Sequence, residues 1–284
     1  MMNVALMQYA VEATRELTYE KVQSILDKTL DKQVNYLLMP ELFSTHYFCQ
    51  DQDQANFKKA QSIDGSDVDF LKNISIKFGV FLSTSFFEKQ IDGIYYNTAV
   101  TISPQGKVIS LYRKSHIPQD PCFEEKYYFK PGDQLPKIID VAGIKTATAV
   151  CWDQWFPELA RCLTLRGSQL INYPTAIAWL KGEEETFHEQ LNAWLTVTRS
   201  HAISNGLFVS CVNRVGTEKD LQFWGHSHLT APTGKSIIEF TKDEEGVKCA
   251  QVDLKLIEQS RTAWPFLRDR RPDLYHDLVS ASDI

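Results

Sequence analysis

The segment 144–167 is predicted to form a strand, a turn and a helix, with a cysteine in the turn. Residues 144–150 are an apolar, β-branched run typical of a buried strand. The helix signals follow: Pro157 at the first position, Glu158 in the first turn and Gly167 just past the end. Free backbone N–H groups and the helix dipole would favour a thiolate at Cys151. Cys151 is therefore either a nucleophile or a small buried residue.

Strands and helices alternate along the whole chain, which predicts a single α/β domain over 1–284. Strands are predicted at 3–8, 34–39, 80–87, 94–102, 107–112, 144–150, 169–173, 207–213, 226–231, 236–240 and 247–253. Helices are predicted at 15–32, 67–78, 157–166 and 187–205. Residues 262–284 are rich in aromatic residues, Arg, Asp and Pro, show no clear period, and are interpreted as a C-terminal tail.

Composition excludes several classes of protein. The chain has 284 residues, 43% hydrophobic and 23% charged, with a net charge of −6. An acidic chain is a poor partner for nucleic acid but suits a cationic small molecule. No apolar run is long enough to cross a membrane and no signal peptide is evident, so we expect a cytoplasmic protein that binds no membrane. The cysteines show no regular spacing and are expected to be reduced thiols, at Cys49, Cys122, Cys151, Cys162, Cys211 and Cys249.

Two further reactive side chains come directly after predicted strands, as Cys151 does. Glu41 follows the strand 34–39, and Lys114 follows the strand 107–112. Strand ends at one edge of a sheet can converge on one pocket. A carboxylate can serve a thiol as base and then as acid, and a lysine can stabilise the developing oxyanion. Taken singly, Glu41 is equally a capping carboxylate and Lys114 a solvated loop lysine. Together they supply the three roles of acyl transfer.

The motifs of the chain resemble the carbon–nitrogen hydrolase (nitrilase) superfamily over roughly residues 3–260. They are Pro40-Glu41-Leu42-Phe43, Tyr112-Arg113-Lys114-Ser115-His116-Ile117-Pro118, Cys151-Trp152-Asp153-Gln154-Trp155-Phe156-Pro157-Glu158, Tyr173-Pro174-Thr175-Ala176-Ile177, Asn213-Arg214-Val215-Gly216 and Ala231-Pro232-Thr233-Gly234. The resemblance implies a four-layer αββα sandwich and a Glu41–Lys114–Cys151 triad, with no metal and no cofactor. It also implies a second pocket glutamate, Glu125, and self-association as a homodimer or larger, with the tail 262–284 packed on a partner subunit.

The residues after the cysteine indicate a branch of this superfamily. Hydrolases of carbamoyl amino acids use arginines there to bind the substrate carboxylate, whereas this chain has Gln154 and Trp155. The resemblance is greatest to the branch that hydrolyses N-carbamoylputrescine. It implies release of putrescine, CO2 and ammonia through a thiocarbamoyl enzyme, a step of polyamine biosynthesis. The alternatives are an ω-amidase-like deamidase, a nitrilase, an N-carbamoyl-β-alanine hydrolase, or a non-catalytic binding protein on the same fold.

Six residues are predicted to bind the cationic carbamoyl amine: Tyr47, Asp120, Trp152, Trp155, Thr175 and Glu183. The terminal ammonium is expected at Asp120 or at an acid of 183–185, against the ring of Trp155 or Trp179. Residues 183–185 are equally interpreted as a solvated acidic loop. The segments 119–122 and 178–185 depart from the pattern of the branch.

Three weaker signals have other interpretations. His116 or His201 would be the base of a cysteine–histidine hydrolase. His226 and His228, two apart on a predicted strand, would share a face and form half of a metal site, although no third ligand is evident. Cys122 is either redox-sensitive or a filler.

Overall fold

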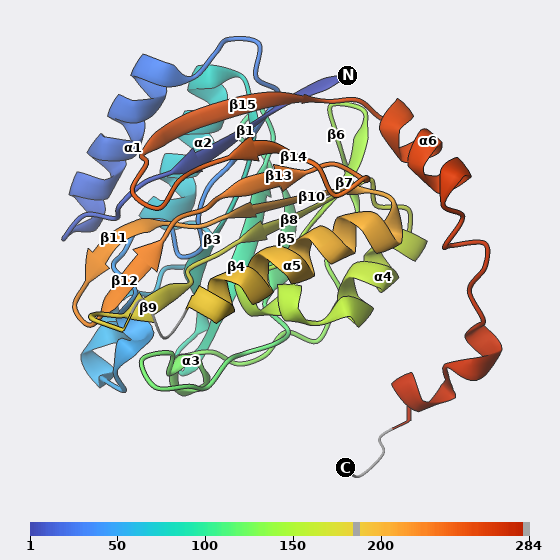
Figure 1. The fold of residues 1–284 in the computed structure, drawn as a ribbon. Coiled ribbons are helices and arrows are strands. Elements are labelled where there is room, and N and C mark those ends of the chain that lie inside the picture. The colour runs from blue at the N-terminus through green and yellow to red at the C-terminus, as the bar shows by residue number, and fades with distance from the viewer. Residues whose placement is uncertain (184–187, 281–284) are drawn as a thin grey trace.

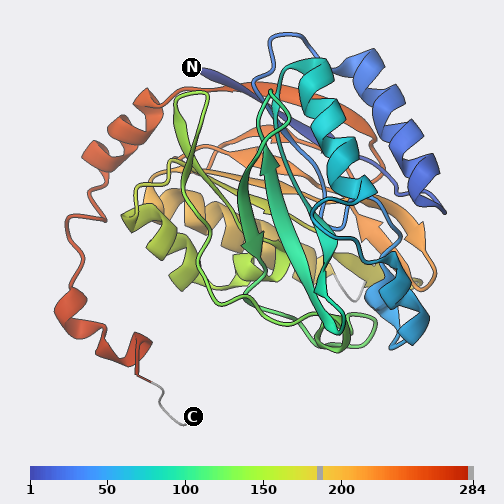
Figure 2. The same ribbon diagram turned by 180° about the vertical axis from the view of Figure 1, so that it is seen from behind.

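The computed structural model describes residues 1–183 and 188–280. Two six-stranded sheets lie face to face, with α1 and α2 outside one and α4 and α5 outside the other (Figures 1 and 2). The strand orders are β15-β1-β2-β3-β4-β5 and β14-β13-β10-β8-β7-β6. This arrangement confirms the four-layer αββα sandwich that the resemblance implied.

The bounds of the elements are as follows. The first sheet contains β1 (Met2–Gln8), β2 (Tyr36–Leu38), β3 (Phe81–Ile91), β4 (Ile94–Ile102), β5 (Val108–Arg113) and β15 (Gly246–Val252). The second contains β6 (Ile139–Val141), β7 (Ile144–Thr148), β8 (Leu170–Pro174), β10 (Phe208–Val212), β13 (His228–Thr230) and β14 (Ser236–Glu239). The α-helices are α1 (Arg15–Thr29), α2 (Ser66–Phe78), α3 (Glu125–Tyr128), α4 (Pro157–Leu165), α5 (His188–Asn205) and α6 (Lys255–Ala263). The short 3₁₀ helices are η1 (Phe48–Gln50), η2 (Gln54–Lys59), η3 (Cys151–Trp155), η4 (Pro272–Leu274) and η5 (His276–Leu278).

Apolar side chains fill the three spaces between the layers, because both faces of each sheet are covered. In β1, Ala5 and Met7 pack in the cluster shared with α1 and α2, whereas Val4 and Leu6 pack in the cluster between the two sheets. The second sheet packs on α4 and α5 through residues such as Ile171. Burial on both faces explains the apolar run Val4–Met7 within β1.

The central strands end at a common edge. The pairs β1–β2, β2–β3, β7–β8 and β8–β10 are parallel. The antiparallel hairpins β3–β4 and β4–β5 return β5 to the direction of β3. Residues that follow β2, β5, β7, β8 and β10 therefore meet at one end of the sandwich.

A third sheet, in the order β11-β12-β9, was not predicted. It contains β9 (Ala178–Leu180), β11 (Val215–Glu218) and β12 (Leu221–Trp224) and lies near the same end of the sandwich (Figure 1). Its strands are too short to show a hydrophobic period.

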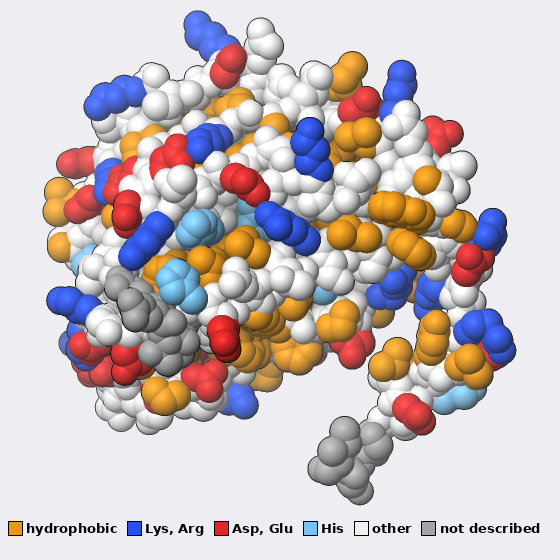
Figure 3. Space-filling model, in the orientation of Figure 1, with side chains coloured by type: hydrophobic (Ala, Val, Ile, Leu, Met, Phe, Trp, Pro, Cys, Tyr) orange, Lys and Arg blue, Asp and Glu red, His pale blue; other side chains and the backbone are white. Residues whose placement is uncertain are grey.

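The C-terminal segment leaves the sandwich. Helix α6 was missed, and after it residues 264–280 run away from the body as a separate arm (Figures 1 and 3). Several of its large hydrophobic side chains are exposed: Trp264, Phe266, Leu274, Tyr275, Leu278 and Val279. Packing of this tail on a partner subunit stays a prediction. Among the described helices, none is long and apolar enough to cross a membrane, and all six cysteines are free thiols.

Candidate active site

Lys114 lies between two carboxylates at the common strand edge. Glu41 follows β2, Lys114 follows β5 and Glu125 begins α3, and all three side chains are buried. Nζ of Lys114 donates to Oε1 of Glu41 at 2.9 Å and to Oε2 of Glu125 at 2.7 Å. One ammonium group thereby joins Glu125, 11 positions away, to Glu41, 73 positions away in the sequence.

Burial and charge set the protonation of this cluster. Burial opposes the charge of Lys114, but the carboxylates of Glu125 and Glu41 raise its pKa well above the ordinary value, so the ammonium is kept. Burial raises the pKa of Glu125 to about 7, against the opposing effect of Lys114. The second glutamate thus titrates near neutral pH.

Cys151 is the first residue of η3 and follows the end of β7 by three residues. It is 5% exposed and has a φ of +39°, a conformation that non-glycine residues adopt mainly at constrained sites. The backbone N–H of Ala176 hydrogen-bonds to its sulfur. The predicted thiolate was wrong: burial and the charge of Glu41 raise the pKa of Cys151 well above its usual value. Helix α4 begins only at Pro157, so the turn has no α-helix dipole directly at the sulfur.

Asp153 builds the turn around the cysteine. Its Oδ2 accepts hydrogen bonds from the backbone N–H of Val150 and from the hydroxyl of Tyr112, both at 2.9 Å. Its Oδ1 accepts from the backbone N–H of His116 at 3.1 Å and lies 2.7 Å from the His116 Nδ1. One buried carboxylate therefore ties the turn that carries Cys151 to the loop that carries Lys114.

The two oxygens of Glu41 have different environments. Oε1 accepts hydrogen bonds from Lys114 and, at 2.7 Å, from Nδ2 of Asn97 on β4. Oε2 is buried and has no hydrogen-bond partner among the described residues. Glu41 thus keeps one oxygen available to take a proton, while the other is held from two sides. Asn97 was missed because an isolated polar residue within a strand gives no local signal.

Tyr47 and Thr175 support the cluster from outside the cavity. The Tyr47 hydroxyl donates to Oε1 of Glu125 at 2.8 Å. The Thr175 carbonyl accepts the backbone N–H of Glu41 at 3.3 Å, and its hydroxyl donates to the Tyr173 carbonyl at 2.9 Å. Neither is among the described residues that line the cavity.

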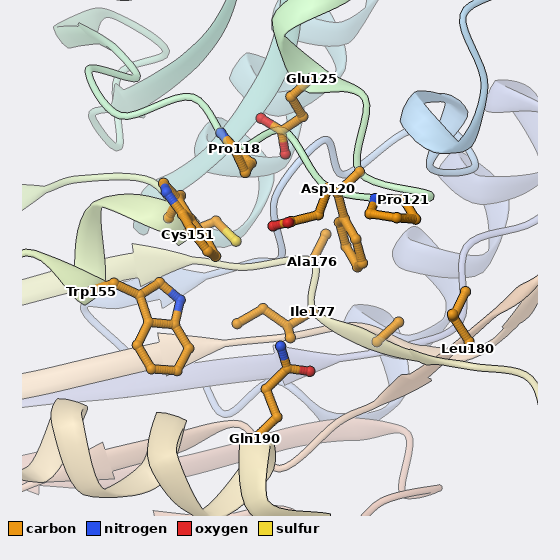
Figure 4. Close-up of a pocket in the computed structure, with 13 residues that line it drawn as sticks. Pro118, Asp120, Pro121, Glu125, Cys151, Trp155, Ala176, Ile177, Leu180 and Gln190 are labelled. Carbon is orange, nitrogen blue, oxygen red and sulfur yellow. The ribbon is translucent and has the colours of Figure 1, made fainter. Parts of the chain in front are cut away.

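A cavity of about 280 Å³ opens beside Cys151 (Figure 4). Its described lining consists of Pro118, Asp120, Pro121, Phe123, Glu125, Cys151, Trp152, Trp155, Ala176, Ile177, Ala178, Leu180 and Gln190. Trp152, Trp155 and Asp120 thus lie where a substrate would contact them, and Gln190, which was not predicted, enters from α5. The described lining carries two carboxylates, Asp120 and Glu125, and no lysine or arginine.

Comparisons with known proteins agree with this geometry. The family model described as carbon-nitrogen hydrolase matches residues 3–262. The chain belongs to the carbon–nitrogen hydrolase superfamily. This carbon–nitrogen hydrolase is 35% identical to an N-carbamoylputrescine amidase of Solanum lycopersicum, over 99% of this chain and 95% of that protein. It is 34% identical to a citrullinase of Francisella tularensis over 97% of each chain. It superposes on a carbon-nitrogen hydrolase from Helicobacter pylori G27 with a TM-score of 0.94, at 37% identity over 99% of each chain.

These similarities confirm the family that the motifs indicated. The protein is an amidase of the superfamily, which acts on carbon–nitrogen bonds other than peptide bonds. The non-catalytic alternative is therefore set aside. The two relatives are named for different substrates, so the substrate has to be inferred from the side chains that line the cavity.

The acids predicted beyond Asp120 are not in the described cavity wall of this carbon–nitrogen hydrolase. Glu183 is exposed, and its backbone N–H donates to the Leu180 carbonyl at 3.0 Å. Glu184 and Glu185 lie outside the described residues. The Trp179 ring is buried against Trp224, with ring centroids 5.1 Å apart, and does not belong to the described lining.

The histidines of the enzyme have other partners. His116 pairs with Asp153, and Nε2 of His201 lies 2.7 Å from the Gln154 carbonyl oxygen. The predicted shared face of His226 and His228 was wrong, because β13 begins at His228 and His226 lies outside it with a φ of +55°. Nε2 of His228 lies 3.0 Å from the hydroxyl of Thr198, and no group of three or more potential metal ligands occurs in the described part of the chain.

Cys122 lies in the turn that carries Asp120. The backbones of Asp120 and Phe123 hydrogen-bond to each other in both directions, at 3.3 and 2.8 Å. Pro121 and Cys122 form the tip, and Cys122 has a φ of +64°. That position favours glycine, so the turn is strained where it approaches the cavity.

Proposed function

We propose that the enzyme hydrolyses a carbamoyl amine with a terminal ammonium group, of the N-carbamoylputrescine type. One observation carries the proposal: the described lining of the cavity has no cationic side chain and contains the Asp120 carboxylate, in addition to Glu125, which is already paired with Lys114. An ammonium tail gains from such a wall, and the neighbouring Trp155 ring adds a cation–π face. Citrulline carries a carboxylate beside its ammonium group, and N-carbamoyl-β-alanine carries a carboxylate and no ammonium group. The described wall offers neither carboxylate a guanidinium or ammonium partner.

The proposed chemistry begins with a neutral thiol. Glu41 takes the Cys151 proton on Oε2 as the sulfur attacks the carbamoyl carbon. Lys114 and the backbone N–H of Trp152 stabilise the oxyanion. Glu41 returns the proton to departing ammonia, which leaves a thiocarbamoyl enzyme.

Water completes the reaction. Activated by Glu41, it attacks the thiocarbamoyl carbon and regenerates the Cys151 thiol. The released carbamate breaks down to CO2 and the amine. Glu125 orients the substrate amide and keeps Lys114 in register, since attack is fast only when the groups are aligned. Cys151→Ala is expected to abolish turnover with the fold intact.

The test compares substrates that differ in one charge. N-Carbamoylputrescine and butylurea share the urea group and the four-carbon chain, but only the first ends in an ammonium group. We expect ammonia and CO2 to be released together, with a lower KM for N-carbamoylputrescine than for butylurea, citrulline or N-carbamoyl-β-alanine. Equal or better kcat/KM with citrulline would overturn the proposed substrate class. An ω-amidase would instead prefer a simple amide, from which it would release ammonia without CO2.

Asp120→Asn identifies the acid that contacts the ammonium. The change is expected to raise KM for N-carbamoylputrescine about tenfold, the worth of a charged hydrogen bond, and to leave KM for butylurea unchanged. Glu183→Gln is the matched control, because both residues are exposed but only Asp120 belongs to the described lining. If Asp120→Asn changes neither KM, the ammonium binds elsewhere.

A further inference from the structure

The motif at 213–216 has no part in the chemistry described so far. Arg214 follows β10, and its side chain is fully buried. A buried arginine is rare and needs partners for its charge and its five N–H donors. Nε has no partner among the described residues, and the hydrogen bonds of Nη1 and Nη2 show what the residue does.

One guanidinium spans the loop that carries Glu41. Nη2 of Arg214 donates to the backbone carbonyls of Glu41 at 2.6 Å and Leu42 at 2.9 Å. Nη1 donates to the Thr45 carbonyl at 3.0 Å and to Oε1 of Glu218 at 2.9 Å. Three of the four acceptors belong to residues 41–45, and the fourth is a buried counter-ion.

This loop needs to be held. Leu42 has a φ of +47°, a left-handed conformation that is unfavourable for a non-glycine residue. Such strain persists only where the surroundings enforce it. Tyr9 donates to the Phe43 carbonyl at 2.9 Å, and the Ser85 hydroxyl accepts the Leu42 N–H at 2.9 Å. Arg214 adds bonds to the carbonyls of Glu41, Leu42 and Thr45.

The same ion pair reaches the second glutamate. The other oxygen of Glu218 accepts the backbone N–H of Tyr47, whose hydroxyl donates to Glu125. Arg214 and Glu218 therefore hold both ends of the loop that positions the two carboxylates around Lys114.

We propose that Arg214 is a positioning residue for Glu41. By binding the carbonyls of the 41–45 loop, it fixes the Glu41 carboxylate relative to Cys151. The inference rests on the proposed role of Glu41 as the base. Arg214 is not among the described residues that line the cavity, so it acts through Glu41 and not on the substrate. Lysine cannot replace it, because one ammonium lacks the planar fork that serves several acceptors at once.

The experiment is a double-variant cycle of Arg214→Lys with Glu41→Asp, which shortens the base by one carbon. The assay is ammonia release from N-carbamoylputrescine, or from a short neutral amide if that substrate is not turned over. Arg214→Lys is expected to lower kcat about 10- to 100-fold, because misplacement of a catalytic group by 1 Å has effects of that size. KM is expected to change less than about twofold, since substrate binding is not touched.

The double variant tests whether Arg214→Lys lowers kcat through Glu41. In the Glu41→Asp background the base is already misplaced, so Arg214→Lys is expected to add little, whereas an independent structural effect would multiply. Arg15→Lys is the matched control. Arg15 also binds a buried carboxylate, Asp67, at 3.0 Å and a backbone carbonyl, that of Lys59, at 2.7 Å, but it lies away from the site. Its replacement is expected to lower stability and leave kcat unchanged.

The outcomes separate the two proposals. If Glu41→Asp leaves kcat at the wild-type value, Glu41 is not the base, and the proposed chemistry falls together with this inference. The inference alone is overturned if Glu41→Asp lowers kcat but Arg214→Lys does not. It is also overturned if the two losses of kcat simply multiply in the double variant, or if Arg214→Lys lowers only stability, as Arg15→Lys does. Should Arg214→Lys not fold, Arg214→Gln with Glu218→Gln replaces it in the same cycle, because it leaves no buried charge unpaired.

Discussion

Replacement of Glu125 by glutamine is expected to change how stability depends on pH. Burial raises the Glu125 pKa from 4.5 to about 7 in the folded protein. Between these values the folded protein holds a proton that the unfolded chain has released, so rising pH favours unfolding. The contribution of Glu125 to stability is present below pH 4.5 and is lost as pH rises to about 7. The pKa difference corresponds to a loss of about 3 kcal/mol.

The assay is reversible urea unfolding of the wild type and of Glu125→Gln at several pH values from 5 to 8. The free energy of unfolding of the wild type is expected to fall relative to that of the variant, with most of the change below pH 7. Glu124→Gln is the matched control, because the neighbouring carboxylate is partly exposed and is hydrogen-bonded by the Gln52 amide. A wild-type-minus-variant difference that stays flat or rises with pH would refute the argument that burial keeps Glu125 protonated.

Three other changes test separate parts of the structure. Both Asp153 oxygens accept hydrogen bonds around the cysteine turn, and Asp153→Asn leaves only one acceptor oxygen. We expect kcat to fall about tenfold in steady-state assays. Cys122→Gly relieves the φ of +64° and is expected to raise the free energy of unfolding by about 0.5–1 kcal/mol in urea, with kcat unchanged. Removal of residues 264–284 takes away an exposed hydrophobic arm, and we expect a smaller assembly by light scattering with unchanged circular dichroism.

The meeting of Glu41, Lys114 and Cys151 was predictable because each has a local signal. Each follows an apolar run that forms a strand, and parallel or co-directional strands end at one edge of the fold. The family motifs further indicated that these three residues belong to one site, because the motifs occur in the expected order and spacing. Helices α1, α2, α4 and α5 were predicted close to their bounds, since their apolar stripes or terminal signals lie within one window of sequence.

Other parts of the site depend on contacts that leave no local pattern. Asn97 and Arg214 bind Glu41 across 56 and 173 positions of the chain. Gln190 looks like any polar residue on the first turns of a helix. The Cys151 pKa was predicted with the wrong sign for the same reason. The turn is visible in the sequence, whereas the burial and the nearby Glu41 charge that dominate at the sulfur are not.

In the proposed mechanism, the charges around the sulfur determine which group limits the reaction. A thiolate at Cys151 would place another buried negative charge near Glu41, and the Lys114 ammonium is already hydrogen-bonded to both Glu41 and Glu125. Burial penalises that arrangement, so the resting cysteine keeps its proton. The proton then has to move as the carbon–sulfur bond forms, and Oε2 of Glu41 is the buried oxygen without a partner among the described residues. We infer that the placement of this oxygen, set by Asn97, Lys114 and Arg214, controls the rate more than the acidity of the thiol does.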